Sequence, residues 1–500
     1  MSNAQEISQA LKRVQRAITQ NQAPIVQSQQ IEREDRVLLL KTRWLDEIIK
    51  GWYLVVRPDV QPGDSTIWYA NIWDFLRLYL EHLYEKDYCL SAENSLDLLL
   101  GESITPNQVV VIVKRGGGFA QSLPFNTAVS IYQDADHFPS EITQIRGLRV
   151  MTLPFAVCKI TPSYFQKQPV EAQVALQAIQ DPQDLIEIIS KYQFRRPAAR
   201  LLAAYKHLGM EMMAHAIETV LHDSGIRLKE NNPFHGMPNP ITSPRVRSPY
   251  YGRVITLWNM LRDQVISNFP KPVRVEKGLE QTVNELYVQD AYNSLSIEGY
   301  VVDEMLIERV QRGSWDPDTF VNDKNQRNAL AARGYFEAHH EVKKTINTIL
   351  EGKNPGEAIA DDLYKWHLAL FNPNVQAGII EKKDLLGYRK GPVYIRNSRH
   401  VPPPREALLD AMDAFFSCLS QESNAVVRAI LGHYIFVYIH PYLDGNGRLG
   451  RLLMNTMFVS GGYPWIIIHV KERKEYMQAL EAVDLKHNIV PLTKFIAKSQ

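Results

Sequence analysis

The sequence predicts a multidomain protein. A mainly α-helical C-terminal domain with a β-hairpin is expected after a winged-helix-like segment and an α+β domain. Three observations predict this class. The 500 residues exceed what one ordinary hydrophobic core holds. Strand-like runs such as QVVVIVK are concentrated in the first half, whereas helical periodicity dominates from about Tyr251. A segment rich in proline and asparagine separates the two halves.

The composition is typical of a folded globular protein. Apolar residues make up 45% and charged residues 22%, and the formal charge of +1 favours neither nucleic acid nor a membrane surface as a general partner. The three cysteines are far apart and form no CxxC pair, which argues against a metal cluster or a disulfide framework. The sequence shows no signal-peptide core and no run of about 18 apolar residues. We therefore expect a cytoplasmic protein without membrane contact.

Residues 1–65 are expected to form the winged-helix-like segment. A charged helical pattern leads into the apolar strand GWYLVV through Gly51. A plain helical lead-in explains the same periodicity, and that alternative stays open. Residues 66–230 mix the amphipathic stretch NIWDFLRLYLEHLY with strand-like runs, which is typical of an α+β regulatory or interaction domain. Residues 231–250 are predicted to be a proline-rich linker, and residues 251–500 a helical domain.

The most informative stretch is HPYLDGNGRLGR. Gly445, Asn446 and Gly447 allow a tight turn, and the apolar residues that follow at helical spacing predict a loop that opens into a helix. The first amide groups of a helix lack intrahelical partners and attract anions. Arg448 and Arg451 are three residues apart and share one face of that helix. The pattern therefore predicts a polyphosphate site.

Two further side chains of this stretch predict chemistry. Asp444 supplies a carboxylate to an otherwise positive site, and Mg²⁺ explains it, because magnesium is typically held by one or two carboxylates plus substrate phosphates. His440 precedes a proline that ends the preceding helix, and its imidazole titrates near neutral pH, so it is a candidate general base. Each residue alone has an ordinary structural explanation, whereas the combination favours a catalytic site.

HPYLDGNGRLGR resembles the signature of Fic domains, HPFx[D/E]GNGRxxR, with Tyr442 in the usual place of phenylalanine. The resemblance extends over about residues 275–500. It implies a helical Fic fold and a protein adenylyltransferase that moves AMP from ATP to a Tyr, Thr or Ser hydroxyl of a target protein or of itself. Related Doc kinases commonly carry lysine where Gly447 stands, so the glycine favours AMP transfer over phosphorylation.

The resemblance also implies a role for each signature residue. His440 would deprotonate the target hydroxyl, and Asp444 would hold Mg²⁺ against the α- and β-phosphates. Asn446 and the neighbouring amides would position the α-phosphate. Arg448 would bind the β-phosphate and Arg451 the γ-phosphate. This division agrees with the chemistry, because the charge that grows on the leaving pyrophosphate must be neutralised.

The stretch AYNSLSIEGY resembles the inhibitory motif of the same family, [S/T]xxxE[G/N], at Ser294, Glu298 and Gly299. A helix over about residues 280–299 would end at Gly299 and present Glu298 on its last turn. The resemblance implies that Glu298 forms a buried, bidentate pair with Arg451 and prevents the γ-phosphate from binding productively. An exposed acid at a helix end is the alternative.

Two other elements receive roles through the resemblance. The segment GYRKGPVYIRNSRHVPPP would be the Fic flap, a hairpin whose Val393 and Ile395 hold the target backbone by strand addition. An ordinary surface hairpin is the alternative. Tyr476, in the amphipathic stretch KERKEYMQALEAVD, would stack on the adenine in the nucleotide pocket. Core packing explains Tyr476 equally well.

The first half resembles AbiE-type antitoxin and regulator proteins, in which a winged helix precedes an α/β domain. Lys41, Arg43 and Lys50 would then contact the DNA backbone, although acidic residues are about as frequent there. A target-docking or dimerising module is the alternative, since Fic proteins often form homodimers.

Three functions stay open. The first is an autoinhibited adenylyltransferase, and the second is a DNA-binding regulator or antitoxin that uses its Fic half as a nucleotide sensor. The third is a Fic enzyme that uses another nucleotide donor or removes AMP. The complete set of catalytic residues favours the first.

Overall fold

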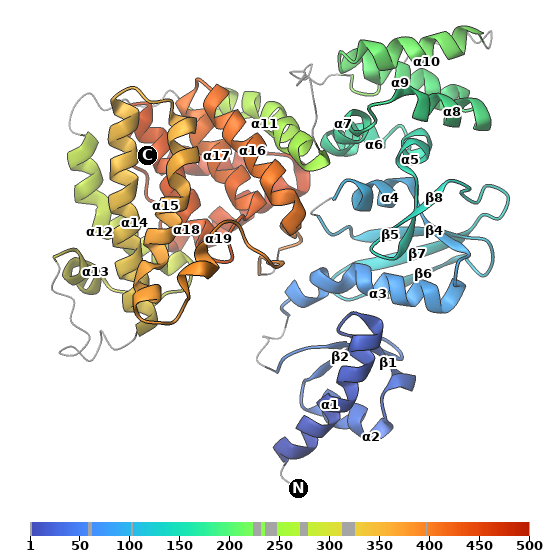
Figure 1. Cartoon of the computed structure of the whole chain (residues 1–500), viewed down its shortest axis with the longest axis horizontal. Coiled ribbons are helices and arrows are strands. Elements are labelled where there is room, and N and C mark those ends of the chain that lie inside the picture. The colour runs from blue at the N-terminus through green and yellow to red at the C-terminus, as the bar shows by residue number, and fades with distance from the viewer. Residues whose placement is uncertain are drawn as a thin grey trace. The chain divides into compact units, whose positions relative to one another are not determined.

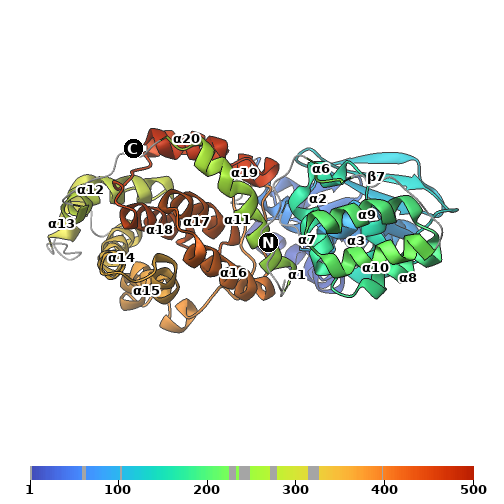
Figure 2. The ribbon, with the colours of Figure 1, turned by 90° about the horizontal axis from the view of Figure 1, so that it is seen from above.

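The computed structural model describes residues 3–58, 63–101, 104–223, 232–235, 248–270, 279–312, 326–396 and 398–499. They fall into two compact units. Unit 1 comprises Met1–Asn239 with Tyr394–Val401, and unit 2 comprises Pro240–Val393 with Pro402–Gln500. Figure 1 shows their helices and strands, and Figure 2 shows the same ribbon from above. Most of the predicted linker, residues 231–250, lies outside the described residues.

Unit 1 begins with a small module of helices and strands. Its elements are α1 (Asn3–Asn21), β1 (Ile25–Gln27), the 3₁₀ helix η1 (Ser28–Gln30), α2 (Arg33–Lys41), β2 (Leu45–Ile49) and β3 (Trp52–Val55). The strands form an antiparallel sheet in the order β1-β3-β2. The chain turns from β2 into β3 at Gly51, whose φ of +86° suits a residue without a Cβ atom.

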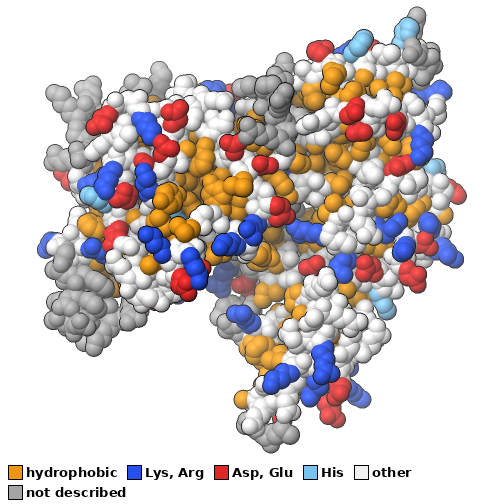
Figure 3. Space-filling model, in the orientation of Figure 1, with side chains coloured by type: hydrophobic (Ala, Val, Ile, Leu, Met, Phe, Trp, Pro, Cys, Tyr) orange, Lys and Arg blue, Asp and Glu red, His pale blue; other side chains and the backbone are white. Residues whose placement is uncertain are grey.

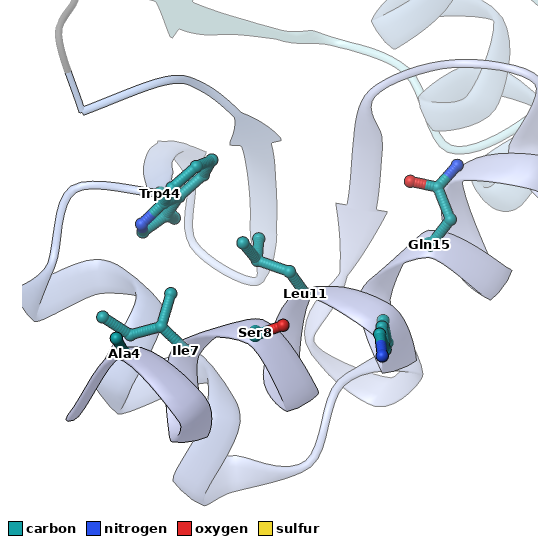
Figure 4. Close-up of a pocket in the computed structure, with 7 residues that line it drawn as sticks. Ala4, Ile7, Ser8, Leu11, Gln15 and Trp44 are labelled. Carbon is teal, nitrogen blue, oxygen red and sulfur yellow. The ribbon is translucent and has the colours of Figure 1, made fainter. Parts of the chain in front are cut away.

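An open hollow of about 530 Å³ lies beside α1 in this module. Figure 4 shows its lining from α1 and from the turn after α2: Ala4, Ile7, Ser8, Leu11, Lys12, Gln15 and Trp44. Ile7, Leu11 and Trp44 also pack against the buried cluster that contains Val14 and Leu39. The hollow is therefore the open edge of a small hydrophobic core.

The rest of unit 1 is an α+β region. Its elements are α3 (Thr66–Tyr84), β4 (Tyr88–Leu90), α4 (Ala92–Leu99), β5 (Gln108–Val113), β6 (Phe119–Leu123), β7 (Thr127–Gln133), β8 (Ile142–Ile145), β9 (Leu148–Met151), α5 (Leu153–Lys159), α6 (Tyr164–Lys167), α7 (Pro169–Ala178), α8 (Pro182–Tyr192), α9 (Arg195–His207) and α10 (Glu211–Asp223). The main sheet has the order β4-β5-β7-β6, in which only β5 and β7 are parallel, and β8 pairs with β9.

One buried cluster joins the first module to the α+β region. The rings of Trp52 in β3 and Phe75 in α3 lie 5.7 Å apart, edge to face. Leu54 of β3 belongs to the same cluster, as do Val111 and Val129 of the main sheet. This hydrophobic core therefore crosses the predicted boundary between residues 65 and 66.

Unit 2 is helical. Its elements are α11 (Pro249–Asn268), α12 (Leu279–Ile297), α13 (Glu304–Gln311), α14 (Gln326–Leu350), α15 (Pro355–Gln376), η3 (Lys382–Leu385), η4 (Arg405–Ala407), α16 (Leu408–Gln421), α17 (Ala425–Ile439), α18 (Asn446–Ser460), η5 (Val470–Glu472), α19 (Arg473–Lys486) and α20 (Val490–Lys498). The helices α14 and α15 lie side by side, and so do α17 and α18 (Figure 1). None of the described helices is both long and apolar enough to cross a bilayer.

The hairpin predicted for GYRKGPVYIRNSRHVPPP is not formed by the described residues of that segment, 387–396 and 398–404, which contain no strand. The backbone groups are used elsewhere, because the Thr105 N–H donates to Arg399 O (3.1 Å) and His400 forms an isolated bridge with Ile104. The three prolines that follow offer no N–H for a ladder. Tyr394–Val401 consequently belongs to unit 1, so Val393 and Ile395 fall in different units.

Figure 3 shows how charge is distributed on one face of the molecule. Basic and acidic side chains lie among one another there rather than in separate fields. This mixture agrees with the formal charge of +1 for the whole chain.

Candidate active site

The predicted signature forms the loop between α17 and α18. His440 ends α17 in the left-handed conformation (φ +52°, ψ +59°), and Gly445 precedes α18 with φ +86°. A Cβ atom at Gly445 would lie 2.8 Å from Leu370 Cδ2 and 3.0 Å from Phe371 Cε2, so the position has no room for a larger residue. The structure confirms the predicted transition from a loop into a helix.

The imidazole of His440 is held in one tautomer. Its Nδ1 lies 3.1 Å from the carbonyl oxygen of Val437. A carbonyl oxygen only accepts hydrogen bonds, so Nδ1 carries the proton and Nε2 keeps its lone pair. Burial lowers the pKa of His440 below its ordinary 6.5, although the hydrogen bond to Val437 opposes this shift. His440 is therefore neutral at neutral pH, as a general base requires.

Arg389 fixes the backbone of this histidine and was missed by sequence reasoning. Its guanidinium Nε donates to His440 O (2.8 Å), and its own N–H donates to Pro441 O (2.9 Å). The side chain is buried and also donates to the carbonyl oxygens of Gly391 and Pro403. An arginine in an irregular segment has no periodicity that would predict burial, so no local signal could have identified it.

Asn446 closes the loop with its side chain. The Tyr442 N–H donates to Asn446 Oδ1 (3.0 Å), and Asn446 Nδ2 donates to Tyr442 O (2.8 Å). The Asn446 side chain therefore holds the turn closed through both of its polar atoms. Tyr442, in the usual place of phenylalanine, is buried and stacks on His367 with ring centroids 3.8 Å apart.

Arg448 is the most deeply buried cation of the site, with 1% of its surface exposed. Its Cζ lies 5.1 Å from the ring centroid of Tyr300 and 5.3 Å from that of Phe371. Among the residues that the structure describes, its Nε and Nη2 atoms have no hydrogen-bond partner, although Nη2 lies 3.3 Å from Asp444 Oδ1. Buried charged donors without acceptors are costly, so this guanidinium is suited to bind an anion.

Asp444 fits the magnesium that the resemblance implies. Its side chain is 64% exposed, and Oδ1 accepts the Gly445 N–H at 2.6 Å. The described residues contain no group of three or more His, Cys, Asp or Glu side chains placed for a metal ion. A single carboxylate beside a phosphate site is nevertheless the ordinary protein contribution to Mg²⁺, which takes its other ligands from phosphates and water.

The inhibitory motif lies where α12 ends. Gly299 has φ +85°, its N–H donates to Ser296 O (3.0 Å), and the Tyr300 N–H donates to Leu295 O (3.1 Å). These two bonds form a Schellman motif, which ends the helix with Glu298 at the C-cap position. The prediction that the helix presents Glu298 at its C-terminus is confirmed.

Arg451 divides its donors between two residues of this motif. Its Nη2 donates to Glu298 Oε1 (2.8 Å) and to Ser294 O (3.0 Å), and its Nε donates to Ser294 Oγ (3.0 Å). The expected bidentate pair is thus replaced by a shared arrangement, and Glu298 is 35% exposed rather than buried. Burial is the largest single influence and lowers the pKa of the Arg451 guanidinium, but Glu298, Tyr476 and Tyr335 together raise that pKa above its ordinary value. A Cβ atom at Gly447 would collide with Glu298 Oε1.

Tyr476 belongs to the core, so the predicted role in adenine stacking is wrong. Only 2% of the residue is exposed, which leaves no ring face for a base. Its hydroxyl lies 2.6 Å from His433 Nε2, and its ring packs against Phe495. Burial raises the pKa of Tyr476 to about 12 and lowers that of His433 to about 4, so both groups are neutral.

Comparisons with known proteins agree with this geometry. Residues 358–458, which contain the signature loop, match the Fic/DOC family. A protein described as "Protein adenylyltransferase Fic" from Culex quinquefasciatus is 29% identical over 230 residues, 45% of this chain and 42% of that protein. One of the same description from Nematostella vectensis is 30% identical over 225 residues, 44% of this chain and 48% of that protein.

This chain therefore spans less than half the length of these curated relatives. Among solved structures, Fic-1 from C. elegans aligns with 66% of this chain and 89% of that chain, with 19% sequence identity and a TM-score of 0.36.

Proposed function

Given that the chain carries a Fic domain, we propose that it is a protein adenylyltransferase that moves AMP from ATP to a target hydroxyl. One observation carries this proposal: the signature stretch puts neutral His440 at the end of α17 and buried Arg448 in the first turn of α18, and Arg448 Nε and Nη2 lack hydrogen-bond partners among the described residues. A base and an anion receptor at the two ends of one short loop are the parts that transfer of a nucleotidyl group requires. The description of the curated relatives supports the same activity.

The proposed reaction is an in-line displacement at the α-phosphorus. His440 Nε2 takes the proton of the target hydroxyl, and the oxygen bonds to the α-phosphorus. The bond from that phosphorus to the bridging oxygen of the β-phosphate breaks, and pyrophosphate leaves with the bonding electrons. Arg448 would neutralise charge on the β-phosphate, and the first amides of α18 would receive phosphate oxygens, which the burial of Arg448 and the start of α18 at Asn446 support. When bound, Mg²⁺ held by Asp444 would supply further neutralisation of the phosphates.

We propose that Glu298 inhibits AMP transfer by its own chain, and we call its contact with Arg451 the brake. Its carboxylate shares Arg451 with Ser294 and fills the space beside Gly447. An ATP γ-phosphate would need the same guanidinium donors, so it competes with the carboxylate. Binding of the ATP γ-phosphate to Arg451 would therefore require Glu298 to move away.

The docking site for the target stays a proposal. Strand addition requires free backbone groups in an extended segment, and residues 392–395 have no regular structure of their own. The carbonyl oxygen of Ile395 already accepts the Ser398 N–H at 3.1 Å. Val393 is consequently the better candidate for pairing with a target strand.

A second candidate function is DNA binding by the first module of unit 1. The sheet order β1-β3-β2 with α2 inserted between β1 and β2 favours the predicted winged-helix arrangement. Lys41, Arg43 and Lys50 are exposed there. The test is fluorescence anisotropy with duplex DNA, in which binding that weakens steeply between about 50 and 200 mM salt would support phosphate contacts. A homodimer and a cytoplasmic location stay predictions.

The decisive experiment follows radiolabel from ATP into protein. Wild type, Glu298→Gly and Glu298→Gly/His440→Ala are incubated with ATP labelled at the α- or at the γ-phosphorus. We expect strong α-label with Glu298→Gly, weak label with wild type and none with the double variant. Transfer of γ-label would show a kinase instead. Absence of label from every variant would contradict catalysis. Competition by another nucleotide would identify a different donor. Loss of label from protein that was already labelled would identify AMP removal.

A further inference from the structure

We infer that Tyr300 is a positioning residue that holds the phosphate-binding guanidinium of Arg448 and joins it to the segment that carries the brake. The inference rests on the proposed function, in which Arg448 receives the β-phosphate. Tyr300 lies outside both motifs that the sequence singled out, directly after Gly299.

Arg448 lies between two aromatic rings that come from distant parts of unit 2. Its Cζ is 5.1 Å from the ring centroid of Tyr300, which follows α12, and 5.3 Å from that of Phe371 in α15. An aromatic ring attracts a guanidinium through its π-electrons, and the attraction strengthens where water is excluded. With 1% of its surface exposed, Arg448 is in such a place.

This kind of contact holds the cation without using its hydrogen-bond donors. Arg448 Nε and Nη2 are buried and have no hydrogen-bond partner among the described residues, and Nη2 has only the ion-pair contact with the exposed Asp444 at 3.3 Å. A carboxylate in place of the rings would hold Arg448 as firmly but would occupy the donors that a phosphate needs. The two rings therefore hold the Arg448 guanidinium in position and leave its donors available to a phosphate.

Tyr300 is itself fixed by contacts that do not involve Arg448. Its N–H donates to Leu295 O (3.1 Å) in the cap of α12, and the next N–H, of Val301, donates to Asn328 Oδ1 (3.3 Å). The Tyr300 ring also contacts a second arginine, because Arg327 Cζ lies 5.3 Å from its centroid. These hydrogen bonds hold the backbone of Tyr300 in place, and the ring contacts a second guanidinium in addition to that of Arg448.

The same tight turn contacts both arginines of the signature. Glu298 accepts from Arg451, and Tyr300, two residues later, packs against Arg448. The turn thus occupies Arg451, the proposed receptor for the γ-phosphate, and supports Arg448, the proposed receptor for the β-phosphate. A nucleoside diphosphate should consequently bind the braked protein well, and its affinity should depend on the Tyr300 ring.

The test measures the affinities of AMP, ADP and ATP by isothermal titration calorimetry on the full chain. Tyr300→Phe retains the ring and is the matched control for Tyr300→Leu. We expect Tyr300→Leu to weaken ADP by about 2- to 30-fold, the range of a cation–π contact, and to leave AMP unchanged. Tyr300→Phe should match wild type. Phe371→Leu removes the second ring and should produce the same selective loss of ADP affinity, so the inference stays testable if Tyr300→Leu does not fold.

Unchanged or tighter ADP binding by both ring-deleted variants would overturn the inference. An equal loss of AMP affinity would also overturn it, because that result indicates general damage to the site. In either case, AMP and ATP binding by Glu298→Gly would leave the proposed function intact. If no variant bound any adenine nucleotide, Glu298→Gly included, the inference and the proposed function would both fail.

Discussion

The carboxylate oxygen Oε1 of Glu298 lies 2.8 Å from Nη2 of Arg451. This contact joins the end of α12 to the first turns of α18, two segments that are far apart in the sequence. The Glu298 carboxylate therefore lies in an anion site, where it competes with a phosphate for the donors of Arg451. Five predictions follow from this site and from the helices that support it.

Glu298→Gly should increase AMP transfer by about 10-fold. This is the lower end of what a charge-assisted hydrogen bond contributes, because Glu298 is 35% exposed and its charge is partly screened. The measurement is the initial rate of α-label incorporation at an ATP concentration well below KM, where competition between Glu298 and the γ-phosphate limits the rate. Glu304→Ala removes a nearby exposed acid and should leave the rate unchanged. Equal rates for Glu298→Gly and wild type would remove the case for a brake.

Gly447→Ala should release the brake in part. The added methyl group collides with Glu298 Oε1, the end of a flexible side chain that can move away. We expect transfer to rise in the single variant, and no further rise when Gly447→Ala is combined with Glu298→Gly, because both changes act on one contact. A lower rate in the double variant than in Glu298→Gly would show that the methyl group also obstructs the nucleotide.

Arg389→Lys should slow catalysis without weakening nucleotide binding. A lysine retains the charge but cannot reach the carbonyl oxygens of His440, Gly391 and Pro403 together. Misplacement of a catalytic group by about 1 Å costs on the order of 100-fold in rate. The variant is compared with its parent for kcat and for ATP affinity in the Glu298→Gly background. A loss of ATP affinity with unchanged kcat would assign Arg389 a different role.

Gly334→Ala should destabilise unit 2 by about 1–3 kcal/mol, the usual cost of overpacking. A Cβ atom at Gly334 of α14 would collide with the Leu370 carbonyl group of α15, and backbone cannot rotate away. Gly391→Ala is the matched control, because no atom lies within 4 Å of its added Cβ. Urea unfolding followed by circular dichroism measures both variants. Equal stability of the two would mean that α14 and α15 separate easily.

AMP transfer by Glu298→Gly should persist below the ordinary histidine range. Burial and the charge of Arg389 lower the pKa of His440 below 6.5, while Glu298 raises it, so removal of Glu298 lowers it further. The active form of the base is neutral, so the rate falls only when the pH drops through this lowered pKa. A profile of kcat/KM from about pH 5 to 8 tests this range of titration. An acid limb with its midpoint above 6.5 would contradict the assignment of His440.

Local sequence determined the parts of the site that lie close together in the chain. Glycines at 445 and 447 permit a turn, and a spacing of three puts Arg448 and Arg451 on one helical face, whatever the rest of the fold does. The contact of Glu298 with Arg451 was expected only through resemblance to a family, since no periodicity links these residues.

Tertiary structure alone decided the remaining contacts. Burial of Tyr476, support of His440 by Arg389 and support of Arg448 by Tyr300 depend on which helices pack together. The hairpin predicted over residues 387–404 is absent from the described residues for a related reason, because Arg399 and His400 pair instead with Thr105 and Ile104, which are distant in the sequence. Sequence specifies conformation over a few residues through φ preferences and periodicity, whereas pairing between distant segments is settled by the packing of the whole fold.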